Sequence, residues 1–594
     1  IRKYLVSKIH LRRQRRQKGV IVNFDASDFD PDTEFFKIGN GSVGGKARGL
    51  AFESDLLRHL SKMMENFSDV NIIIPKSLVI TTDGFEAFIQ RNHLLDVADT
   101  GLPDEEIAER FLKAEFPKWI RNDLEVYLKD IYYPIAVRSS SLLEDAQFRA
   151  YAGLYRTYML PNDCRSFIRR TEHVINAIKL VYASTYFKGP KSFSRRVGHR
   201  TEEEKMAVII QSMVGDTYGE HFYPALSGVA QSHNYYPFSH MKPEEGIATI
   251  ALGLGKMVVE GEKTLRFSPR YPQLLPQRST VEDILENSQR YFYALKMEKA
   301  CSMLSINDTS HLDKREMFDA ENEYPVSFLS STYIPDEHRI RDTSHGPGHR
   351  VITFSQILKY NSFPLPDIIS TFLNIGQNGM GCPVEIEFSV NLSQKRGIPP
   401  TFALLQLRPM TARAELEVID ISDEEIENAF CYSSNALGNA HKNDITDIVY
   451  VKPDVFDPAK TIEIAREIGE MNNFFSNTDR KYLLIGPGRW GSADRWLGIP
   501  VEWTDICNVD VIAETASERM QAEPSQGSHF FHNITTMGIN YITISERNGG
   551  FYNGDWLASI PAKKESAHVR YVTLDKPVTI KVDGRTSRCV MINQ

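Results

Sequence analysis

The sequence predicts an α/β (α+β) protein built of a two-lobed module followed by a separate C-terminal α/β domain. Buried-type strands such as residues 206–214 alternate with helical segments such as 104–128, a pattern typical of layered α/β folds. The length of 594 residues is too great for one hydrophobic core and suits three or four domains of about 150 residues. An apolar fraction of 42% and a charged fraction of 25% are those of an ordinary globular chain.

Periodicity and turn residues predict the elements in order. The first lobe should contain strands near 20–24, 71–75, 77–81, 133–138 and 206–214, with helices at 47–60, 104–128 and 165–188. Farther on, short strands and glycine turns are expected over 227–270, a strand at 351–354, a strand pair within 383–409, and strands at 482–485 and 541–544.

Shifts in composition divide the chain into domains. The predicted parts are a basic lead from an upstream segment (1–34), the first lobe (35–226), the second lobe (227–414) with a polar, weakly periodic insertion (about 271–350), an acidic linker with a helix (415–429) and the C-terminal domain (430–594). The upstream segment is inferred because the chain begins at Ile1 rather than Met.

Charge, hydropathy and cysteine usage exclude several classes of protein. Residues 1–18 carry eight Lys and Arg and no acid, and a solvated connecting helix is favoured there over a nucleic-acid or membrane contact. The chain lacks both a run of about 18 apolar residues and a secretory leader, so we expect a cytoplasmic protein without membrane or nucleic-acid partners. The six cysteines are far apart and form no Cys-x-x-Cys, which predicts reduced thiols.

A glycine-rich turn leads into the first predicted helix. Gly44, Gly45 and Lys46 offer unhindered backbone N–H groups and one ammonium at a helix start, which suits polyphosphate oxygens. The turn is not a Walker loop, and an ordinary glycine turn is the alternative.

An arginine follows at the end of a predicted strand, in Ala-Val-Arg-Ser-Ser-Ser over 136–141. The planar guanidinium of Arg138 suits phosphate oxygens and keeps its charge in a dry site. The alternative is an ion pair between Arg138 and Glu144 or Asp145.

Two predicted strands carry polar residues at alternate positions. Glu385 and Glu387 share one face of the first strand, and Gln406 and Arg408 share one face of the second. Since Mg²⁺ usually takes one or two protein carboxylates together with phosphate and water, a hairpin of these strands would place metal ligands beside a phosphate-reading Arg and an amide. Solvated faces of an edge hairpin are the alternative.

Together these motifs resemble the ATP-binding module of the phosphoenolpyruvate synthase and pyruvate phosphate dikinase family, an ATP-grasp-type domain, over about residues 35–412. The resemblance rests on the order Gly-Gly-Lys, Ala-Val-Arg-Ser-Ser-Ser, Met-Ala-Val-Ile-Ile-Gln-Ser-Met-Val, Ser-Gly-Val-Ala, Gly-Leu-Gly, Val-Glu-Ile-Glu-Phe and Leu-Gln-Leu-Arg-Pro-Met. One departure is that Ser-Gly-Val-Ala is followed by Gln231 and Ser232, where the family usually reads Phe-Thr.

The resemblance implies ATP and Mg²⁺ as ligands and assigns roles to individual positions. These roles are ATP-phosphate contact (Lys46, Arg138), adenine contact through a strand backbone (Gln211, Met213), a phosphate-covering loop (Gly253, Gly255), Mg²⁺ binding (Glu385, Glu387) and contact with the transferring phosphate (Gln406, Arg408).

A histidine in the C-terminal domain is the candidate phosphoryl acceptor. Gly527, Ser528 and His529 are followed after eight residues by Gly538, which resembles the spacing of the family's phosphohistidine swivel motif. A neutral imidazole at an exposed helix start is a competent nucleophile. Phe530, Phe531 and His532 depart from the small residues of that motif, and a half-buried structural histidine is the alternative. A rival, His345, precedes Gly-Pro-Gly and is expected in a loop.

A second glycine-rich turn precedes this histidine. Gly486 to Gly491 is expected to be a structural turn packed by Trp490, with anion binding or docking of a phosphohistidine loop as the alternatives. Nothing after residue 412 offers the roughly 250 residues of a TIM barrel.

The predicted function is that of an ATP- and Mg²⁺-dependent phosphotransferase of the resembled family. It would phosphorylate a histidine, His529 in cis or one on a partner, and pyruvate or another acceptor would be served by a missing or separate domain. The alternatives are a non-catalytic ATP-binding regulatory module and a dikinase acting on a polysaccharide or small molecule. The final acceptor and a homo-oligomeric state are left open by the sequence.

Overall fold

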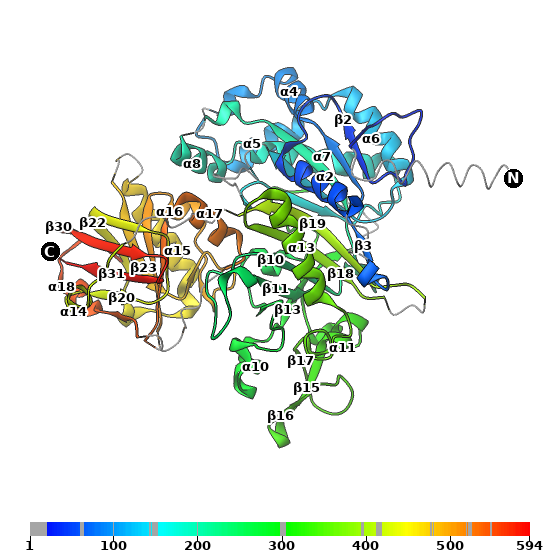
Figure 1. Ribbon diagram of the computed structural model, residues 1–594. Helices are drawn as coiled ribbons and strands as arrows, with labels where there is room; N and C mark the ends of the chain where they lie inside the picture. The colour runs from blue at the N-terminus through cyan, green and yellow to red at the C-terminus, as the bar shows by residue number, and fades with distance from the viewer. Residues whose placement is uncertain are drawn as a thin grey trace.

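Three bodies make up the molecule: two lobes stacked on each other, and a C-terminal domain beside them (Figure 1). The computed structural model describes residues 21–59, 65–98, 100–141, 144, 152–198, 200–297, 304–393, 397–410, 419–475, 478, 480–517, 520, 526–546 and 549–593. Across these residues, none of the helices has both the length and the apolar character that a membrane crossing would require. The predicted α/β class with a separate C-terminal domain is confirmed.

The first lobe is a six-stranded mixed sheet covered by helices. Its order is β1 (Val22–Asn23), β2 (Phe35–Ile38), β4 (Ser77–Ile80), β7 (Met206–Ser212), β5 (Ile135–Ser141) and β6 (Thr157–Leu160). Strands β1, β2 and β4 are parallel, whereas β7, β5 and β6 each run antiparallel to the strand before them. Its helices are α2 (Gly44–His59), α4 (Thr82–Arg91), α5 (Asp104–Lys113), α6 (Lys118–Asp130), α7 (Phe167–Ser184) and α8 (Lys188–Val197).

Two helix boundaries differ from the predictions. Helix α2 begins at Gly44, three residues early, so Gly44 to Lys46 form its first turn. The single helix predicted over 104–128 is broken into α5 and α6 before Pro117, since proline lacks an N–H and disfavours a helical conformation in the preceding residue.

The second lobe is a six-stranded sheet that borrows a strand from the other end of the module. Its order is β12 (Leu265–Phe267), β11 (Ile247–Leu252), β10 (Leu226–Gln231), β18 (Val384–Asn391), β19 (Thr401–Pro409) and β3 (Asn71–Ile73). All pairs are antiparallel except β19 with β3. The predicted hairpin of β18 and β19 is confirmed. Helix α13 (Leu365–Met380) packs on this sheet, and Gly49 of α2 reaches so close that a Cβ there would lie 2.7 Å from the Leu407 carbonyl oxygen.

The weakly periodic stretch 271–350 is regular in the structure. Strands β13 (Tyr291–Lys296) and β14 (Leu312–Glu316) join β8 (Asp216–Tyr218) and β9 (His221–Tyr223) in a four-stranded sheet. A three-stranded sheet follows, made of β15 (Ser330–Ile334), β16 (Arg339–Arg341) and β17 (His349–Ile352). Strands of three to six residues hold too few positions for a clear alternation, which is why the pattern was weak.

The C-terminal domain is a large mixed sheet with helices. Its order is β21 (Ala436–Leu437), β27 (Asn540–Ile544), β26 (Val509–Thr515), β23 (Tyr482–Pro487), β22 (Ala440–Val451), β30 (Val569–Asp583), β31 (Arg588–Ile592), β20 (Cys431–Ser433) and β28 (Phe551–Tyr552), with β29 (Ala562–Glu565) on β30. Helix α17 (His529–Met537) connects the parallel strands β26 and β27. The other α-helices are α14 (Asp423–Glu427), α15 (Thr461–Asn472), α16 (Trp503–Ile506) and α18 (Gly554–Ser559).

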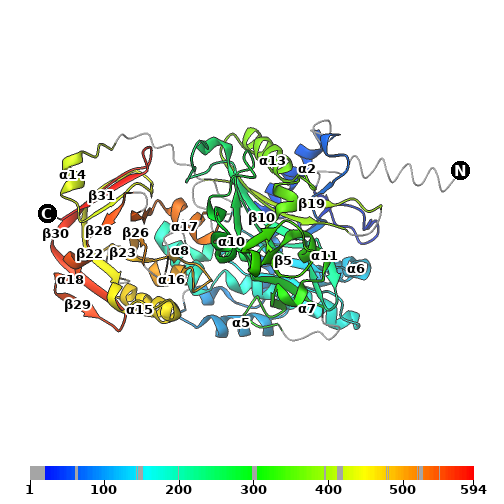
Figure 2. The same cartoon turned by 90° about the horizontal axis from the view of Figure 1, so that it is seen from below.

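The C-terminal domain is docked on both lobes, with α16 and α17 at the boundary in both views (Figures 1 and 2). Against the first lobe, Phe193 of α8 meets Trp503 of α16 edge to face at 5.7 Å, and Arg196 donates to the Cys507 carbonyl. Against the second lobe, Phe531 of α17 packs on Tyr235 at a centroid distance of 5.7 Å.

One cysteine departs from the expectation that all thiols are reduced. Cys164 is disulfide-bonded, whereas Cys382, Cys431, Cys507 and Cys589 are free. A disulfide requires two Cβ atoms about 4 Å apart in the fold, and spacing along the chain does not reveal that proximity.

Candidate functional site

A cavity of about 280 Å³ lies where the two lobes and the C-terminal domain meet. Its walls come from the first lobe, from the strands β10, β18 and β19 of the second lobe, and from the start of α17. Of the residues singled out in the sequence, the cavity is lined by Lys46, Arg138, Gln211, Met213, Gly255, Glu387, Gln406, Arg408 and His529. Gly253 and Glu385 are not among its lining residues.

Lys46 is held at one end of the cavity by a buried carboxylate. Its ammonium lies 2.5 Å from Glu144 Oε1 and 3.3 Å from Ser139 Oγ, which itself donates to the same carboxylate oxygen. Helix α2 can approach strand β5 this closely because Gly44 has no side chain: a Cβ there would lie 1.7 Å from the Ser140 carbonyl oxygen. Glu144 therefore pairs with Lys46 and not with Arg138.

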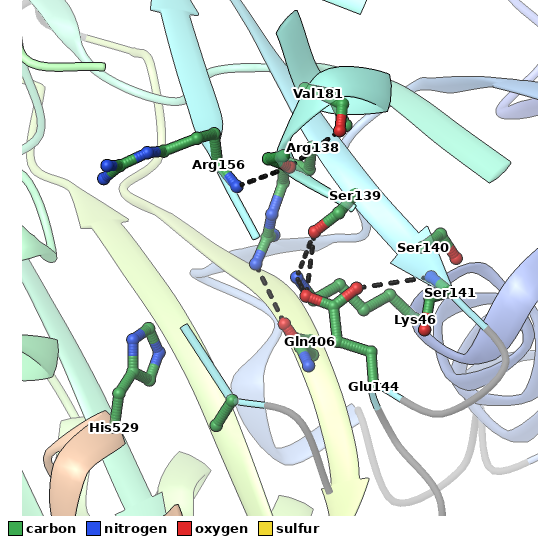
Figure 3. Close-up of polar contacts among 12 residues, drawn as sticks. Lys46, Arg138, Ser139, Ser140, Ser141, Glu144, Arg156, Val181, Gln406 and His529 are labelled. Carbon is green, nitrogen blue, oxygen red and sulfur yellow. Dashed lines mark hydrogen bonds and ion pairs between the residues drawn. The ribbon is translucent and has the colours of Figure 1, made fainter. Parts of the chain in front are cut away.

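Arg138 joins the two lobes. It emerges from β5 and donates to Gln211 Oε1 of the first lobe at 3.0 Å. It also donates to Gln406 Oε1 in the second lobe at 2.9 Å (Figure 3). A further bond runs from Arg138 to Glu387 Oε2 at 3.1 Å. A guanidinium is suited to this place since it has five donors and keeps its charge when buried.

The two strand carboxylates have different surroundings. Glu387 lines the cavity opposite Gln406 of β19, with 14% of its side chain exposed. Burial raises the pKa of Glu387, but the His529 imidazole 4.0 Å away and the guanidinium groups of Arg138 and Arg408 outweigh burial and hold the pKa well below its usual range. Glu387 is therefore an anion at neutral pH.

Glu385 lies two residues away and is closed off by its neighbours. Its side chain is 1% exposed and is bound by Arg408, whose Nε donates at 2.8 Å, and by Gln231, whose Nε2 donates at 2.5 Å. The carboxylate is therefore already engaged by an arginine and an amide, and it lies outside the cavity lining.

The strand predicted to contact adenine lines the cavity through residues 211–214. Gln211 is 3% exposed, and its Nε2 has no hydrogen-bond partner among the residues that the structure describes. A buried amide donor without a partner is costly, so a ligand oxygen in the cavity would satisfy it. Gly253 instead lies behind the cavity, where a Cβ would meet the Tyr293 carbonyl oxygen at 2.7 Å.

His529 is the first residue of α17, and its side chain points into the cavity (Figure 3). The hydroxyl of Ser528 caps the helix by accepting from the Phe531 amide. The imidazole is 29% exposed, and its Nε2 lies 4.0 Å from Glu387 Oε1. A Cβ on Gly153 would lie 2.2 Å from His529 Nδ1, so only a glycine admits the ring at this depth.

The neighbours that seemed unfavourable in the sequence turn away from the cavity. Phe531 is buried against Tyr235 and Tyr541, and Phe530 packs over Gly491 in the second glycine-rich turn. The buried histidine of this helix is His532, at 4% exposure. Burial, together with the nearby charge of Arg408, lowers the pKa of His532 well below its usual range, so His532 is neutral.

Sequence reasoning assigned no role to four charged residues that line the cavity. Arg156 lies on the segment leading into β6, Lys256 begins α9 (Lys256–Val259), and Glu260 and Asp308 lie nearby. Lys256 pairs with Glu260, and Arg156 approaches Asp308 at 3.9 Å. Only their positions in the sequence could have indicated a role for two of these residues. Lys256 follows the Gly-Leu-Gly motif, and Arg156 lies in the segment after Ser-Ser-Ser.

Nucleotide binding in the presence of Mg²⁺ fits the residues of the cavity. Among the residues described, no three His, Cys, Asp or Glu side chains are grouped to hold a metal on their own. Mg²⁺ is usually bound by one or two carboxylates plus phosphate oxygens, and the ionised Glu387 beside two arginines provides the protein part of such a set.

Fold and cavity together define the class: a two-lobed nucleotide-binding module with a separate α/β domain docked over its binding site. A family model described as the pyruvate phosphate dikinase AMP/ATP-binding domain matches residues 40–428, more than half of the chain. The chain belongs to this family.

Several curated proteins are similar over part of their length. The chain is 24% identical over 262 residues to the uncharacterized phosphotransferase YvkC of Bacillus subtilis (strain 168), covering 44% of this chain and 27% of that protein. Phosphoenolpyruvate synthase of Deinococcus radiodurans is 27% identical over 224 residues, with 34% and 26% covered. The Escherichia coli (strain K12) phosphoenolpyruvate synthase is 25% identical over 293 residues, with 44% and 34% covered. The matched part is thus about a quarter to a third of these relatives.

Proposed function

We propose that this protein is an ATP-dependent phosphotransferase that moves a phosphoryl group from ATP to His529. The observation that carries the proposal is that His529, from a separate domain, lines the same cavity as Lys46, Arg138 and Glu387. In phosphoryl transfer, catalysis is mainly positioning and charge neutralisation, and these residues offer both.

The polyphosphate of ATP would lie along the positively charged side chains that line the cavity. Lys46 and Arg138 would bind phosphate oxygens from the first lobe, with Arg156 and Lys256 as further cations on the cavity wall. Gln406 and Arg408 would contact the transferring group from β19. Glu387 would hold Mg²⁺, which, when bound, neutralises phosphate charge. Adenine would lie against residues 211–214.

His529 would act as the nucleophile. A neutral imidazole has one nitrogen lone pair, and the imidazole of His529 lies in the cavity beside Glu387. An N–P bond would form as the P–O bond to the nucleotide breaks, and the nucleotide would leave with the electron pair. From His529 the phosphoryl group would pass to a final acceptor, either pyruvate, which the family description names, or another molecule.

Labelled ATP tests the proposal. Two incubations with Mg²⁺ are compared, one with ATP labelled at the β position and one with ATP labelled at the γ position. The transferred label should be acid-labile and alkali-stable on the protein, and His529→Ala should abolish it. His345→Ala, which changes the exposed loop histidine, is the matched control and should label like the wild type. The position of the label decides which phosphate is transferred. Equal labelling of His529→Ala and wild type, or no labelling of either, would contradict the proposal.

A further inference from the structure

Two rows of cross-strand neighbours lie side by side on the strands β10, β18 and β19. One row, Val229, Glu387 and Gln406, lines the cavity. The other row is displaced by two residues and consists of Gln231, Glu385 and Arg408, which are direct cross-strand neighbours. Since side chains two residues apart on a strand share a face, the second row runs parallel to the first.

The second row is joined by buried hydrogen bonds and continues into the C-terminal domain. Arg408 and Gln231 both donate to Glu385, and Gln231 Oε1 accepts from Gln526 Nε2 at 2.8 Å. The same Gln526 amide group donates to the His233 carbonyl at 3.3 Å. Gln231 is 2% exposed and Gln526 is 6% exposed, so this contact is shielded from water.

The hydrogen bond between the two amides has a fixed direction. An ionised carboxylate only accepts, so the Nε2 of Gln231 must face Glu385 and its Oε1 must face Gln526. Gln526 must therefore donate. The ion pair of Arg408 with Glu385 thus sets the orientation of the Gln231 amide, and Gln231 in turn sets that of Gln526. Arg408 itself lines the cavity.

Gln526 lies three residues before His529. Gly527 and the helix cap Ser528 follow it, and both lie against the second lobe: a Cβ on Gly527 would lie 3.5 Å from Thr249 Oγ1, and a Cβ on Gly261 would lie 3.5 Å from the Ser528 Cβ. Fixing the Gln526 side chain on the second lobe therefore fixes the segment from which α17 starts, and with it the position of the imidazole.

We propose that Gln231 and Gln526 form a docking latch that positions His529 in the cavity. They are positioning residues, since they act through the segment before α17 and do not line the site of transfer. The role of the latch in phosphorylation rests on the proposed function, whereas docking itself does not.

The latch is tested by a docking measurement and a transfer measurement made on the same full-length variants. Gln526→Met keeps the size of the side chain but removes its hydrogen bonds to Gln231 and to the His233 carbonyl. Gln526→Glu keeps the shape of the side chain but removes its N–H donors. Loss of one shielded hydrogen bond should speed backbone hydrogen–deuterium exchange in residues 526–537 by roughly 3- to 10-fold in Gln526→Met. The increase in exchange should be larger in Gln526→Glu, because a carboxylate oxygen then faces the Gln231 oxygen and two acceptors meet without a proton between them.

Transfer should change with docking, and ATP binding should not. The rate of labelling of His529 should fall by the same factor by which hydrogen–deuterium exchange in residues 526–537 rises. The Kd for ATP should stay within about twofold of wild type. Combining Gln231→Met with Gln526→Met should weaken docking by less than the sum of the two single losses, because both variants remove the same Gln231–Gln526 hydrogen bond. Gln273→Met, on an exposed glutamine of the second lobe, is the matched control and should leave all three measurements unchanged.

The outcomes separate the two proposals. Wild-type exchange in both Gln526 variants, or additive losses in the double variant, would overturn the latch. If the variants exchange faster while the wild type never carries label on His529, the latch stands and the phosphotransfer proposal falls.

Discussion

The two sides of the cavity are built in different ways. On the lobe side, cations are held by carboxylates from other elements, Lys46 by Glu144 and Arg138 by Glu387, so their positions are set before any ligand arrives. On the C-terminal side, a short helix presents one partly exposed imidazole. Preorganised charge costs no reorganisation during transfer, whereas a group brought in by a docked domain can leave again. Under the proposed function, the lobes would stabilise charge during transfer and the C-terminal domain would bring in the acceptor histidine.

Replacing Glu387 should have the largest effect on chemistry. Glu387→Gln removes the ionised carboxylate that faces both Arg138 and His529, and the first-order rate of His529 phosphorylation should fall about 100- to 1,000-fold. Rapid-quench labelling measures this rate. Glu337→Gln, which alters a surface pair with Arg341, is the control and should react at the wild-type rate. A fall of less than about threefold would remove Glu387 from the site.

Replacing Glu385 should affect stability instead of chemistry. Glu385→Gln removes the carboxylate that is hydrogen-bonded to the buried Arg408, and breaking one side of a buried ion pair costs about 3–5 kcal/mol. Urea unfolding of the full chain should show the loss as a lower midpoint with an unchanged slope. If Glu385→Gln weakens Mg²⁺ dependence as much as Glu387→Gln does while unfolding like the wild type, the distinction between the two carboxylates is wrong.

A change at Gly153 tests the docked position of His529 without altering the residues proposed to bind ATP. Gly153→Ala places a methyl group within 2.2 Å of His529 Nδ1, at a residue whose φ is +65°, so the docked position should be lost in part. Phosphorylation of His529 should slow roughly 10-fold, the effect expected of about 1.4 kcal/mol, with ATP affinity retained. Gly198→Ala, which has a similar φ and open space around it, is the control. Equal losses in the two variants would show that backbone strain, and not the contact with His529, is responsible.

A buried acid beneath α17 should give the C-terminal domain a pH-dependent stability. Burial raises the pKa of Glu514 to about 8 despite hydrogen bonds from Tyr541 and Trp490, against a usual value of 4.5. Between these values the folded state holds a proton that the unfolded chain has released, so stability falls as pH rises, by at most about 1.4 kcal/mol per pH unit. Urea unfolding from pH 5 to 8 should show this slope in the wild type and a flatter one in Glu514→Gln. An equal slope in both would contradict the assignment.

The two sides of the cavity also differ in how many of their residues could be predicted from the sequence. On the lobe side, Lys46, Arg138 and Gln406 come from local patterns of a turn, a strand end and an alternating strand, and the structure brings them to one cavity. Alternation could not reveal that Glu385, on the same face as Glu387, is covered by Gln231 of a strand more than 150 residues earlier. Arg156 and Lys256 were missed for the same reason, because neither lies in a pattern that marks it.

On the C-terminal side, spacing identified the helix start but not its surroundings. His529 begins α17 as the Gly-Ser-His pattern indicated. Whether the adjacent phenylalanines would cover it depended on which faces of α17 meet Gly491 and Tyr235, and these are long-range contacts. Gln526 carried no recognisable pattern, since its partner Gln231 is known only from the fold.

Mixing two inactive variants tests most directly the claim that the docked domain receives the phosphoryl group within its own molecule. Glu387→Gln retains His529 but lacks the cavity carboxylate, and His529→Ala retains the cavity but lacks the acceptor. Transfer within one chain predicts that an equimolar mixture with labelled ATP gives no more label on His529 than Glu387→Gln gives alone. Label accumulating on His529 of the Glu387→Gln chain at a rate near that of wild type, and rising with concentration, would contradict the account.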